Sequence, residues 1–273
     1  MKTVIPSEIT PVQLQTIMQT AVSPRPIALA STIDKDGNSN LSPFSFFNMF
    51  STVPPILIFS PSRRVRDNTT KHTLENVHAV SEVVIGTVNF PIVQQISLAS
   101  TEYGDGVNEF VKSGLTMKDA DLVKPKLIEE CPVNFECKVL EIKSLGDQGG
   151  AGNLVICEVV KIHIRQEYLN AEGNLDQAKL DMVARLGGNW YSRNNENSLF
   201  EVPKPLVTKG IGFDLLPDAI KYSKVFTGND LGMLANIEVL PSENCHDDET
   251  IHQNAQKLLL ESKIEEAWKI LLK

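Results

Sequence analysis

The chain has 273 residues, and its 34 acidic side chains outnumber 26 basic ones, which gives a formal net charge of −8. This balance argues against a nucleic-acid-binding protein, which normally presents a basic face. No run of about 20 apolar residues is present, so we expect no membrane span. The first residues lack the apolar stretch of a signal peptide, so the expected location is the cytoplasm.

The first predicted elements are a helix and a β-hairpin. Residues 10–13 (TPVQ) form a helix start, with a threonine cap, proline at the first position and glutamine three residues after the cap. The apolar run 27–33 then leads through residues 34–38 (DKDGN) into a second strand. Asp, Gly and Asn suit the tight connection of a hairpin.

The second strand of this hairpin, residues 40–47 (NLSPFSFF), is unusual for a core strand. Polar side chains and Pro43 interrupt it, and proline removes a donor from the ladder. Backbone amides left free beside Pro43 would suit a planar, hydrogen-bonding ligand. The alternative is an irregular edge strand, and this segment alone does not decide between the two.

A basic segment follows the next predicted strand, residues 55–60. It carries Arg63, Arg64, Arg66 and Lys71 among several hydroxyl side chains, and a short helix is predicted near residues 73–77. Arginine, lysine and the free amides of a helix start are typical ligands of phosphate. A solvated surface loop is the alternative interpretation.

Further along the chain, β patterns predominate. Strands are predicted at residues 80–88, 133–142 and 153–164, with a helix at 91–99 and a glycine-rich turn at 146–152. Several strands at short intervals and tight turns indicate a closed or nearly closed barrel. His163 falls in a strand and is expected to pack rather than to catalyse.

The character of the sequence changes after residue 205. We predict two domains, residues 1–205 and a C-terminal extension 206–273, with one long terminal helix that begins near residue 247. The extension is expected to cover the barrel or a partner subunit. His246 and His252 are expected to be exposed, and the glycine-containing segments 210–214 and 227–232 to be connecting turns.

The sequence offers little support for nucleophilic or metal chemistry. The four cysteines form no C-x-x-C pair and have no nearby histidine at zinc-ligand spacing, so they are expected to be small buried residues: Cys131, Cys137, Cys157 and Cys245. No G-x-S-x-G, G-x-G-x-x-G or P-loop motif is present.

Five ordered motifs resemble those of a known family. They are residues 23–29 (SPRPIAL), 40–47 (NLSPFSFF), 54–55 (PP), 71–76 (KHTLEN) and 185–191 (RLGGNWY). Together they resemble the flavin reductase-like family, over about residues 22–193. The fold that this resemblance implies is mainly β with flanking helices, an FMN-binding split β-barrel, which here carries a C-terminal helical extension.

The resemblance also implies a homodimer that holds FMN near the subunit interface. The isoalloxazine ring would lie against residues 40–47 and the phosphate beside the basic segment. The residues that we expect to bind the cofactor are Ser31, Thr32, Asn40, Leu41, Ser42, Pro43, Ser45, Phe46, Ser60, Arg64, Arg66, Lys71, Thr73 and Trp190. His72 stands where relatives commonly have Asp, and Asn153 stands where flavin-reducing relatives often have an Asp.

Three functions follow from this resemblance as hypotheses. The first is a reductase in which NADH or NADPH passes hydride to flavin N5, with an oxygenase or redox protein as a possible acceptor; the cofactor carries this reaction, so no protein nucleophile is expected. The second is a flavoredoxin-like FMN electron carrier. The third, a barrel that has lost its flavin, is disfavoured by the retained Asn40, Ser45, Lys71 and Thr73.

Overall fold

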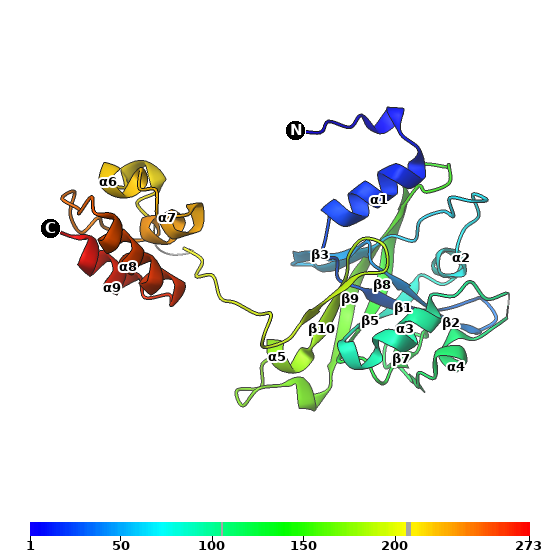
Figure 1. Ribbon diagram of the computed structural model, residues 1–273. Helices are drawn as coiled ribbons and strands as arrows, with labels where there is room; N and C mark the ends of the chain where they lie inside the picture. The colour runs from blue at the N-terminus through cyan, green and yellow to red at the C-terminus, as the bar shows by residue number, and fades with distance from the viewer. Residues whose placement is uncertain (105, 206–208) are drawn as a thin grey trace. The chain divides into compact units, whose positions relative to one another are not determined.

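The computed structural model describes residues 1–104, 106–205 and 209–273. The chain divides into two compact units, Met1–Leu199 and Phe200–Lys273, and each is described by itself (Figure 1). The boundary predicted after residue 205 falls beside residues 206–208, which lie outside the described part of the chain.

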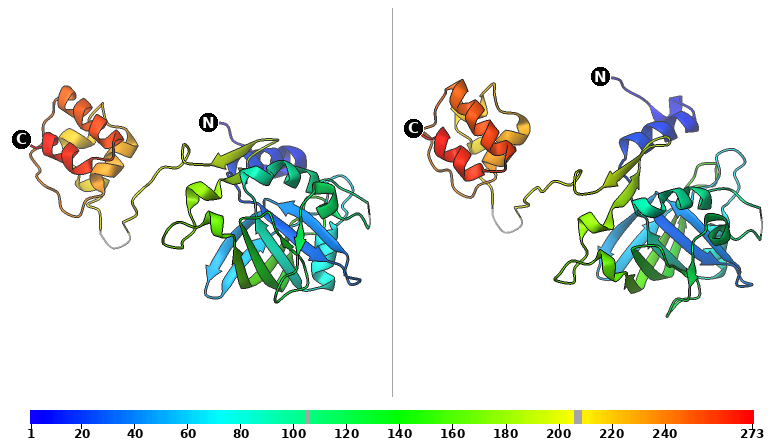
Figure 2. Two further views of the ribbon diagram at one scale, coloured as in Figure 1. Left: turned by 90° about the horizontal axis from the view of Figure 1, so that it is seen from below. Right: turned by 60° about the horizontal axis from the view of Figure 1, so that its bottom comes forward.

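The first unit is built on one antiparallel sheet of seven strands, in the order β2-β1-β5-β8-β9-β4-β3. Its strands are β1 (Ala28–Ile33), β2 (Ser39–Phe44), β3 (Phe47–Thr52), β4 (Pro55–Phe59), β5 (Glu82–Thr87), β8 (Val133–Ser144) and β9 (Asn153–Ile164). Strands β2 and β3 lie at opposite edges of the sheet, yet only Ser45 and Phe46 separate them in sequence. The sheet must therefore curl until its edges approach one another (Figure 2). This confirms the predicted split barrel.

Burial along β1 shows how the curled sheet is filled on both faces. All six residues of β1 are buried. Because side chains alternate along a strand, Ala28 and Ala30 join the interior cluster with Phe59, whereas Ile27 and Leu29 join a cluster on the other face. Helix α2 (His72–Ala79) packs against β1, and α3 (Val93–Ala99) and α4 (Glu109–Ser113) pack against β2.

The predicted hairpin and first helix are confirmed. Strands β1 and β2 pair from Ala28↔Phe44 to Ile33↔Ser39. Helix α1 (Pro11–Ala21) begins with a complete capping box between Thr10 and Gln13. The structure adds one element that we did not separate: the 40–47 segment bends at Ser45 and Phe46, and β3 begins beyond the bend.

Smaller elements complete this unit. They are η1 (Pro6–Glu8), η2 (Phe90–Ile92), η3 (Gln166–Tyr168), α5 (Gln177–Leu180) and two short hairpins, β6 (Met117–Lys118) with β7 (Leu127–Ile128) and β10 (Met182–Arg185) with β11 (Tyr191–Asn194). All four cysteines of the chain are buried, as predicted. Burial raises the pKa of the Cys157 thiol to about 12, so this thiol is inert at neutral pH.

The second unit is helical and has a core of its own. It contains η4 (Phe213–Leu215), α6 (Asp218–Lys221), α7 (Gly228–Ala235), α8 (Glu249–Leu260) and α9 (Ile264–Leu271). Leu259, Trp268 and Leu271 are among its most buried side chains. The extension is thus a small bundle with an internal core.

Three expectations for this unit were wrong. The terminal helix is two helices, because the chain turns at Ser262 (φ 59°), so that α8 and α9 pack on each other. The segment 227–232 starts helix α7, with Thr227 and Asp230 in a capping box. His252 is only 2% exposed, since its ring bonds to the Ser223 hydroxyl and the His246 carbonyl.

No described helix has the length and apolar character needed to cross a bilayer.

Candidate functional site

A polar cleft lies where the two edges of the curled sheet approach. It has a volume of about 370 Å³ and is walled by the β2–β3 bend, the end of β4, the basic segment and helix α1. Phe46 is fixed to β4 by a hydrogen bond from the Ser60 amide to its carbonyl, 2.8 Å. The seam of the barrel therefore forms a hollow rather than a continuous ladder.

Half of the predicted flavin ligands line this cleft: Pro43, Ser45, Phe46, Ser60, Arg64, Arg66 and Lys71. The Lys71 ammonium lies 5.4 Å from the Phe44 ring centroid. Among the described residues, no carboxylate, hydroxyl or carbonyl group pairs with it. Burial lowers the pKa of Lys71. Lys71 is half-buried, and the nearby Glu102 carboxylate partly opposes this effect on its pKa. A cation that lines a cleft without a hydrogen bond or ion pair to a described residue is typical of a site that receives an anion.

Three arginines line the cleft, and two of them, Arg64 and Arg66, pair with a carboxylate. Arg64 Nε lies 2.8 Å and Arg66 Nη2 2.6 Å from the carboxylate of Glu102, which comes from the loop between α3 and α4. The Arg64 side chain is 18% exposed and that of Arg66 70%. Arg64 is therefore part of the cleft wall, whereas Arg66 reaches into solvent. Sequence reasoning missed Glu102, because nothing local marks a lone glutamate in a loop.

Several other predicted ligands come together in the core instead. Asn40 Nδ2 donates to the Thr32 hydroxyl (3.3 Å) and to the Thr73 hydroxyl (3.0 Å), and Asn76 Nδ2 donates to Thr32 (3.1 Å). All four residues are buried. Their hydroxyls and amides join α2 to β1 and β2 behind the cleft and thereby place Lys71, the residue before α2.

The remaining predicted ligands are dispersed. Ser31 is fully buried and its hydroxyl has no hydrogen-bond partner among the described residues. Leu41 is a core residue, and Ser42 is half-buried on edge strand β2. Trp190 is 75% exposed at the turn between β10 and β11 and does not line the cleft.

The backbone amides at the β2–β3 bend are fewer than expected, since Pro43 has none and the Leu41 amide donates to the Glu109 carboxylate at 3.1 Å. Within the described part of the chain, the amides of Ser45 and Phe46 donate to no group. These two amides are the donors that remain of those predicted between residues 42 and 46.

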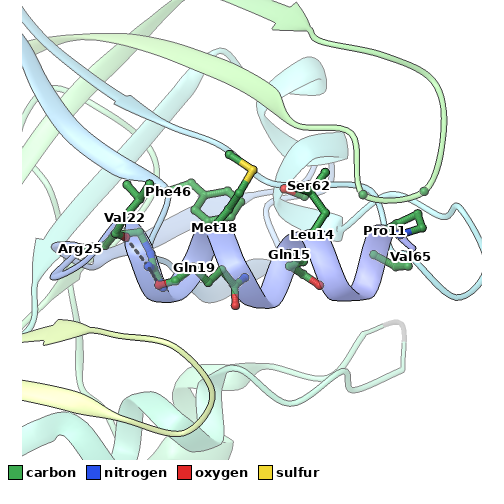
Figure 3. Close-up of a pocket in the computed structure, with 12 residues that line it drawn as sticks. Pro11, Leu14, Gln15, Met18, Gln19, Val22, Arg25, Phe46, Ser62 and Val65 are labelled. Carbon is green, nitrogen blue, oxygen red and sulfur yellow. Dashed lines mark hydrogen bonds between the residues drawn. The ribbon is translucent and has the colours of Figure 1, made fainter. Parts of the chain in front are cut away.

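An apolar cavity adjoins the polar cleft and shares Phe46 and Val65 with it. Its volume is about 500 Å³, and Figure 3 shows Met18 and Leu14 of α1 along one wall. Gln15 and Gln19 of α1 border both hollows. The amphipathic pattern predicted helix α1 but gave no sign that it covers a ligand site.

Arg25 ties α1 to the barrel at one end of this cavity. Its guanidinium donates to the carbonyls of Gln19 (2.5 Å), Val22 (2.6 Å) and, across to the β10 end, Leu186 (3.0 Å), and its Nε contacts Ser45 Oγ at 3.4 Å. Burial is the main cause that lowers the pKa of Arg25. The SPRP motif thus supplies a brace that holds the helix over the hollow.

The glycine-rich turn 146–152 supports the basic segment from behind. Arg63 exchanges backbone hydrogen bonds with Ala151 (2.8 Å) and Gly150 (3.0 Å). A Cβ on Gly149 would lie 3.0 Å from the Arg64 carbonyl, so this close approach requires glycine. Asn153 is buried and its side-chain amide donates to the Pro61 carbonyl at 3.0 Å, which commits its Nδ2 to the structure.

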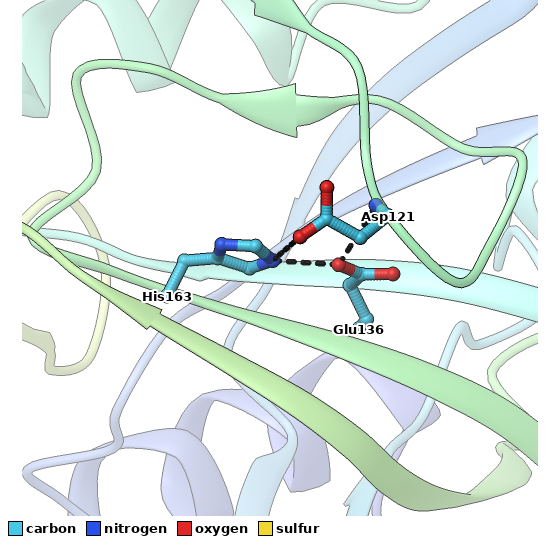
Figure 4. A group of neighbouring side chains, drawn as sticks. All are labelled: Asp121, Glu136 and His163. Carbon is cyan, nitrogen blue, oxygen red and sulfur yellow. Dashed lines mark hydrogen bonds and ion pairs between the residues drawn. The ribbon is translucent and has the colours of Figure 1, made fainter.

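A second charged cluster, Asp121, Glu136 and His163, lies away from the cleft (Figure 4). The Glu136 carboxylate is fully buried and accepts backbone amides of residues 121–123 at 2.6–3.0 Å, and His163 Nε2 at 2.6 Å. Burial alone would raise the pKa of Glu136, but these hydrogen bonds outweigh it and lower the pKa. Both carboxylate oxygens of Glu136 accept hydrogen bonds from the protein, so the cluster stabilises the fold. His163 packs in it, as predicted.

The curled sheet with a cationic cleft at its seam defines the class of FMN-binding split barrels. Residues 20–179, more than half of the chain, match the model of the flavin reductase like domain. The chain belongs to the flavin reductase-like family. Membership supports FMN binding and oxidoreductase activity, and residues 200–273 lie outside the matched region.

Relatives and solved structures agree with this assignment. An uncharacterized protein of Aquifex aeolicus is 37% identical over 170 residues, 62% of this chain and 84% of the relative. Nitrilotriacetate monooxygenase component B from Bacillus cereus superposes with a TM-score of 0.68 at 25% identity, over 74% of this chain and 98% of that one. The flavoredoxin of Desulfovibrio vulgaris has the same fold, with a TM-score of 0.56 at 20% identity over 68% and 93% of the two chains.

Proposed function

We propose that this protein is an FMN-dependent reductase that takes hydride from NADH or NADPH. The observation that carries the proposal is the half-buried Lys71 ammonium, which makes no hydrogen bond or ion pair with a described residue and lines a cleft at the barrel seam beside an apolar cavity. The two hollows, about 370 and 500 Å³, fall within the roughly 300–1,000 Å³ typical of small-molecule sites.

The cationic part of the cleft would hold the phosphate of FMN. Lys71 supplies an ammonium, and Arg64 supplies guanidinium donors from a side chain that is already immobilised by Thr69 (2.9 Å) and Thr70. Charge-assisted hydrogen bonds of this kind contribute roughly 1.5–3 kcal/mol each. The Ser60 hydroxyl lies on the same wall.

The β2–β3 bend would hold the flavin ring. Bound FMN would accept a hydride at N5. Ser45 and Phe46 line the cleft, and their free amides would donate to the ring and stabilise negative charge on it. The exposed Phe46 ring, between the two hollows, offers an apolar surface to a planar group.

The apolar cavity under α1 would receive the nicotinamide. Leu14, Met18 and Val22 give it an apolar lining, and the amides of Gln15 and Gln19 at its border suit a carboxamide. Arg25 keeps α1 in place over this cavity. A dinucleotide fingerprint is not required, because only one ring has to be oriented.

We further propose that the protein is a homodimer that passes electrons to an oxygenase or another redox protein. The structural likeness to a monooxygenase component supports this choice of acceptor. The exposed Trp190 is a candidate contact with the flavin of a partner protomer. An electron carrier is the second candidate, supported by the fold shared with a flavoredoxin.

Anaerobic mixing of FMN-loaded protein with NADH or NADPH tests the proposal. Rapid loss of the flavin absorbance band is the expected result. If NADH and NADPH leave the band unchanged while a reduced redox protein bleaches it, the carrier function replaces the reductase. If titration with FMN at equilibrium shows no binding, both functions are rejected.

A further inference from the structure

The Glu102 carboxylate lies inside the cleft that is proposed above to bind phosphate. It bridges Arg64 Nε and Arg66 Nη2, at 2.8 and 2.6 Å, and lines the cleft together with Lys71. The Arg64 hydrogen bond is the main cause that lowers the pKa of Glu102, so this side chain is ionised at neutral pH. An anion of the protein itself therefore occupies two cationic donors of the site.

Neither arginine depends on Glu102 for its position. Arg64 Nη1 is already held by the Thr69 hydroxyl and the Thr70 carbonyl. Arg66 Nε is bonded to Asp67 at 3.0 Å. Each guanidinium is thus held by residues of its own segment. The nitrogens that face Glu102, Arg64 Nε and Arg66 Nη2, can therefore donate to another acceptor instead.

A carboxylate and a phosphate are interchangeable acceptors for arginine. We propose that Glu102 is a built-in competitor for the ligand phosphate: FMN takes the donors of Arg64 and Arg66 and displaces Glu102, which returns when the flavin leaves. This inference rests on the proposed function and adds a residue that limits flavin affinity.

The consequence is an exchangeable flavin. Competition by an attached group acts at high effective concentration. A carboxylate that can recapture the arginines shortens the lifetime of bound FMN, since affinity differences of this kind are expressed mainly in the dissociation rate. Such a site suits a protein that releases reduced flavin more than one that keeps a permanent cofactor.

The test compares Glu102→Gln with the wild type in titrations with FMN and with riboflavin, which lacks the phosphate. We expect Glu102→Gln to bind FMN about three- to tenfold more tightly, with slower release and an unchanged riboflavin affinity. Glu167→Gln is the matched control, because it removes another exposed carboxylate that pairs with an arginine, Arg165 at 2.5 Å. It should change neither affinity.

Weaker FMN binding in Glu102→Gln would overturn the inference, because Glu102 would then organise the arginines. An equal change for both flavins would also overturn it. Calorimetry with inorganic pyrophosphate separates this question from the proposed function: tighter binding by Glu102→Gln supports the competition even if neither protein binds flavin. Unchanged pyrophosphate affinity rejects it.

Discussion

The first unit contains two charged clusters that differ in how their charges are satisfied. In the cluster of Asp121, Glu136 and His163, the buried carboxylate accepts backbone amides and a histidine, so that its hydrogen-bonding capacity is used internally. In the cleft cluster, the Lys71 ammonium makes no hydrogen bond or ion pair with a described residue, and Arg64 is partnered by a glutamate from a distant loop.

The difference separates charge that stabilises the fold from charge that is held ready for a ligand. A buried carboxylate with its hydrogen bonds complete contributes to stability, and removing it leaves several donors unsatisfied. A half-buried cation without a hydrogen bond or an ion pair adds little to stability and is retained where it binds a ligand. The following substitutions test this contrast, in order of expected effect.

The largest expected effect is the loss of stability in Glu136→Ala. Three backbone amides and His163 would lose their buried acceptor, and we expect the free energy of unfolding to fall by about 3 kcal/mol. Urea unfolding measures it. At temperatures where the variant is folded, its FMN affinity should match the wild type, and a large loss of affinity would contradict the structural role.

Lys71→Met should have the opposite profile. The phosphate would lose a charge-assisted donor, so FMN affinity should fall roughly 10- to 100-fold. Stability should stay the same or rise, since a half-buried cation without a hydrogen bond or ion pair to a described residue is replaced by an apolar side chain of similar length. Flavin titration and urea unfolding of the same preparation measure both; unchanged FMN affinity would exclude Lys71 from the phosphate site.

The pH dependence of FMN binding sharpens the assignment. Burial lowers the pKa of Lys71, so its ammonium loses its proton at a lower pH than an exposed lysine does. FMN affinity should be full below the pKa of Lys71 in the free protein and should decline as the pH rises through it. In Lys71→Arg the side chain stays charged over this range, so the FMN affinity of this variant should not decline. If its FMN affinity declines as in the wild type, another group is responsible.

The smallest effect is expected for Arg66→Ala. Its side chain is 70% exposed, and its carboxylate partners Asp67 and Glu102 are 39% and 38% exposed, so solvent weakens these ion pairs. We expect less than about a threefold change in FMN affinity, against a clearly larger loss for Arg64→Ala. If the two variants lose FMN affinity equally, solvent exposure does not determine how much each arginine contributes to binding.

Local sequence signals predicted the parts of this structure that depend on neighbouring residues. The Thr10 cap and the 34–38 turn each use contacts within a few positions, so both could be predicted. The approach of Gln15 and Glu102 to the cleft depends on the closure of the sheet. The same limit explains His252, whose partner Ser223 lies 29 positions away.

The resemblance predicted ligands by position along the chain, and the structure shows why only half of them line the cleft. Side chains on β2 alternate between its two faces. Asn40 enters the core network, while Ser45, at the bend that follows β2, lines the hollow. A motif written as one run therefore contains both ligand contacts and the framework that positions them. Residues 40–47 serve both purposes.

The two-residue link between β2 and β3 has a mechanical consequence. Ser45 and Phe46 connect the first and last strands of the sheet and also form a wall of the cleft, so any widening of the seam deforms the binding site directly. A molecule seated there would brace the open side of the barrel. Binding of a ligand in the cleft should therefore slow backbone amide exchange in both β2 and β3, although these strands lie at opposite edges of the sheet.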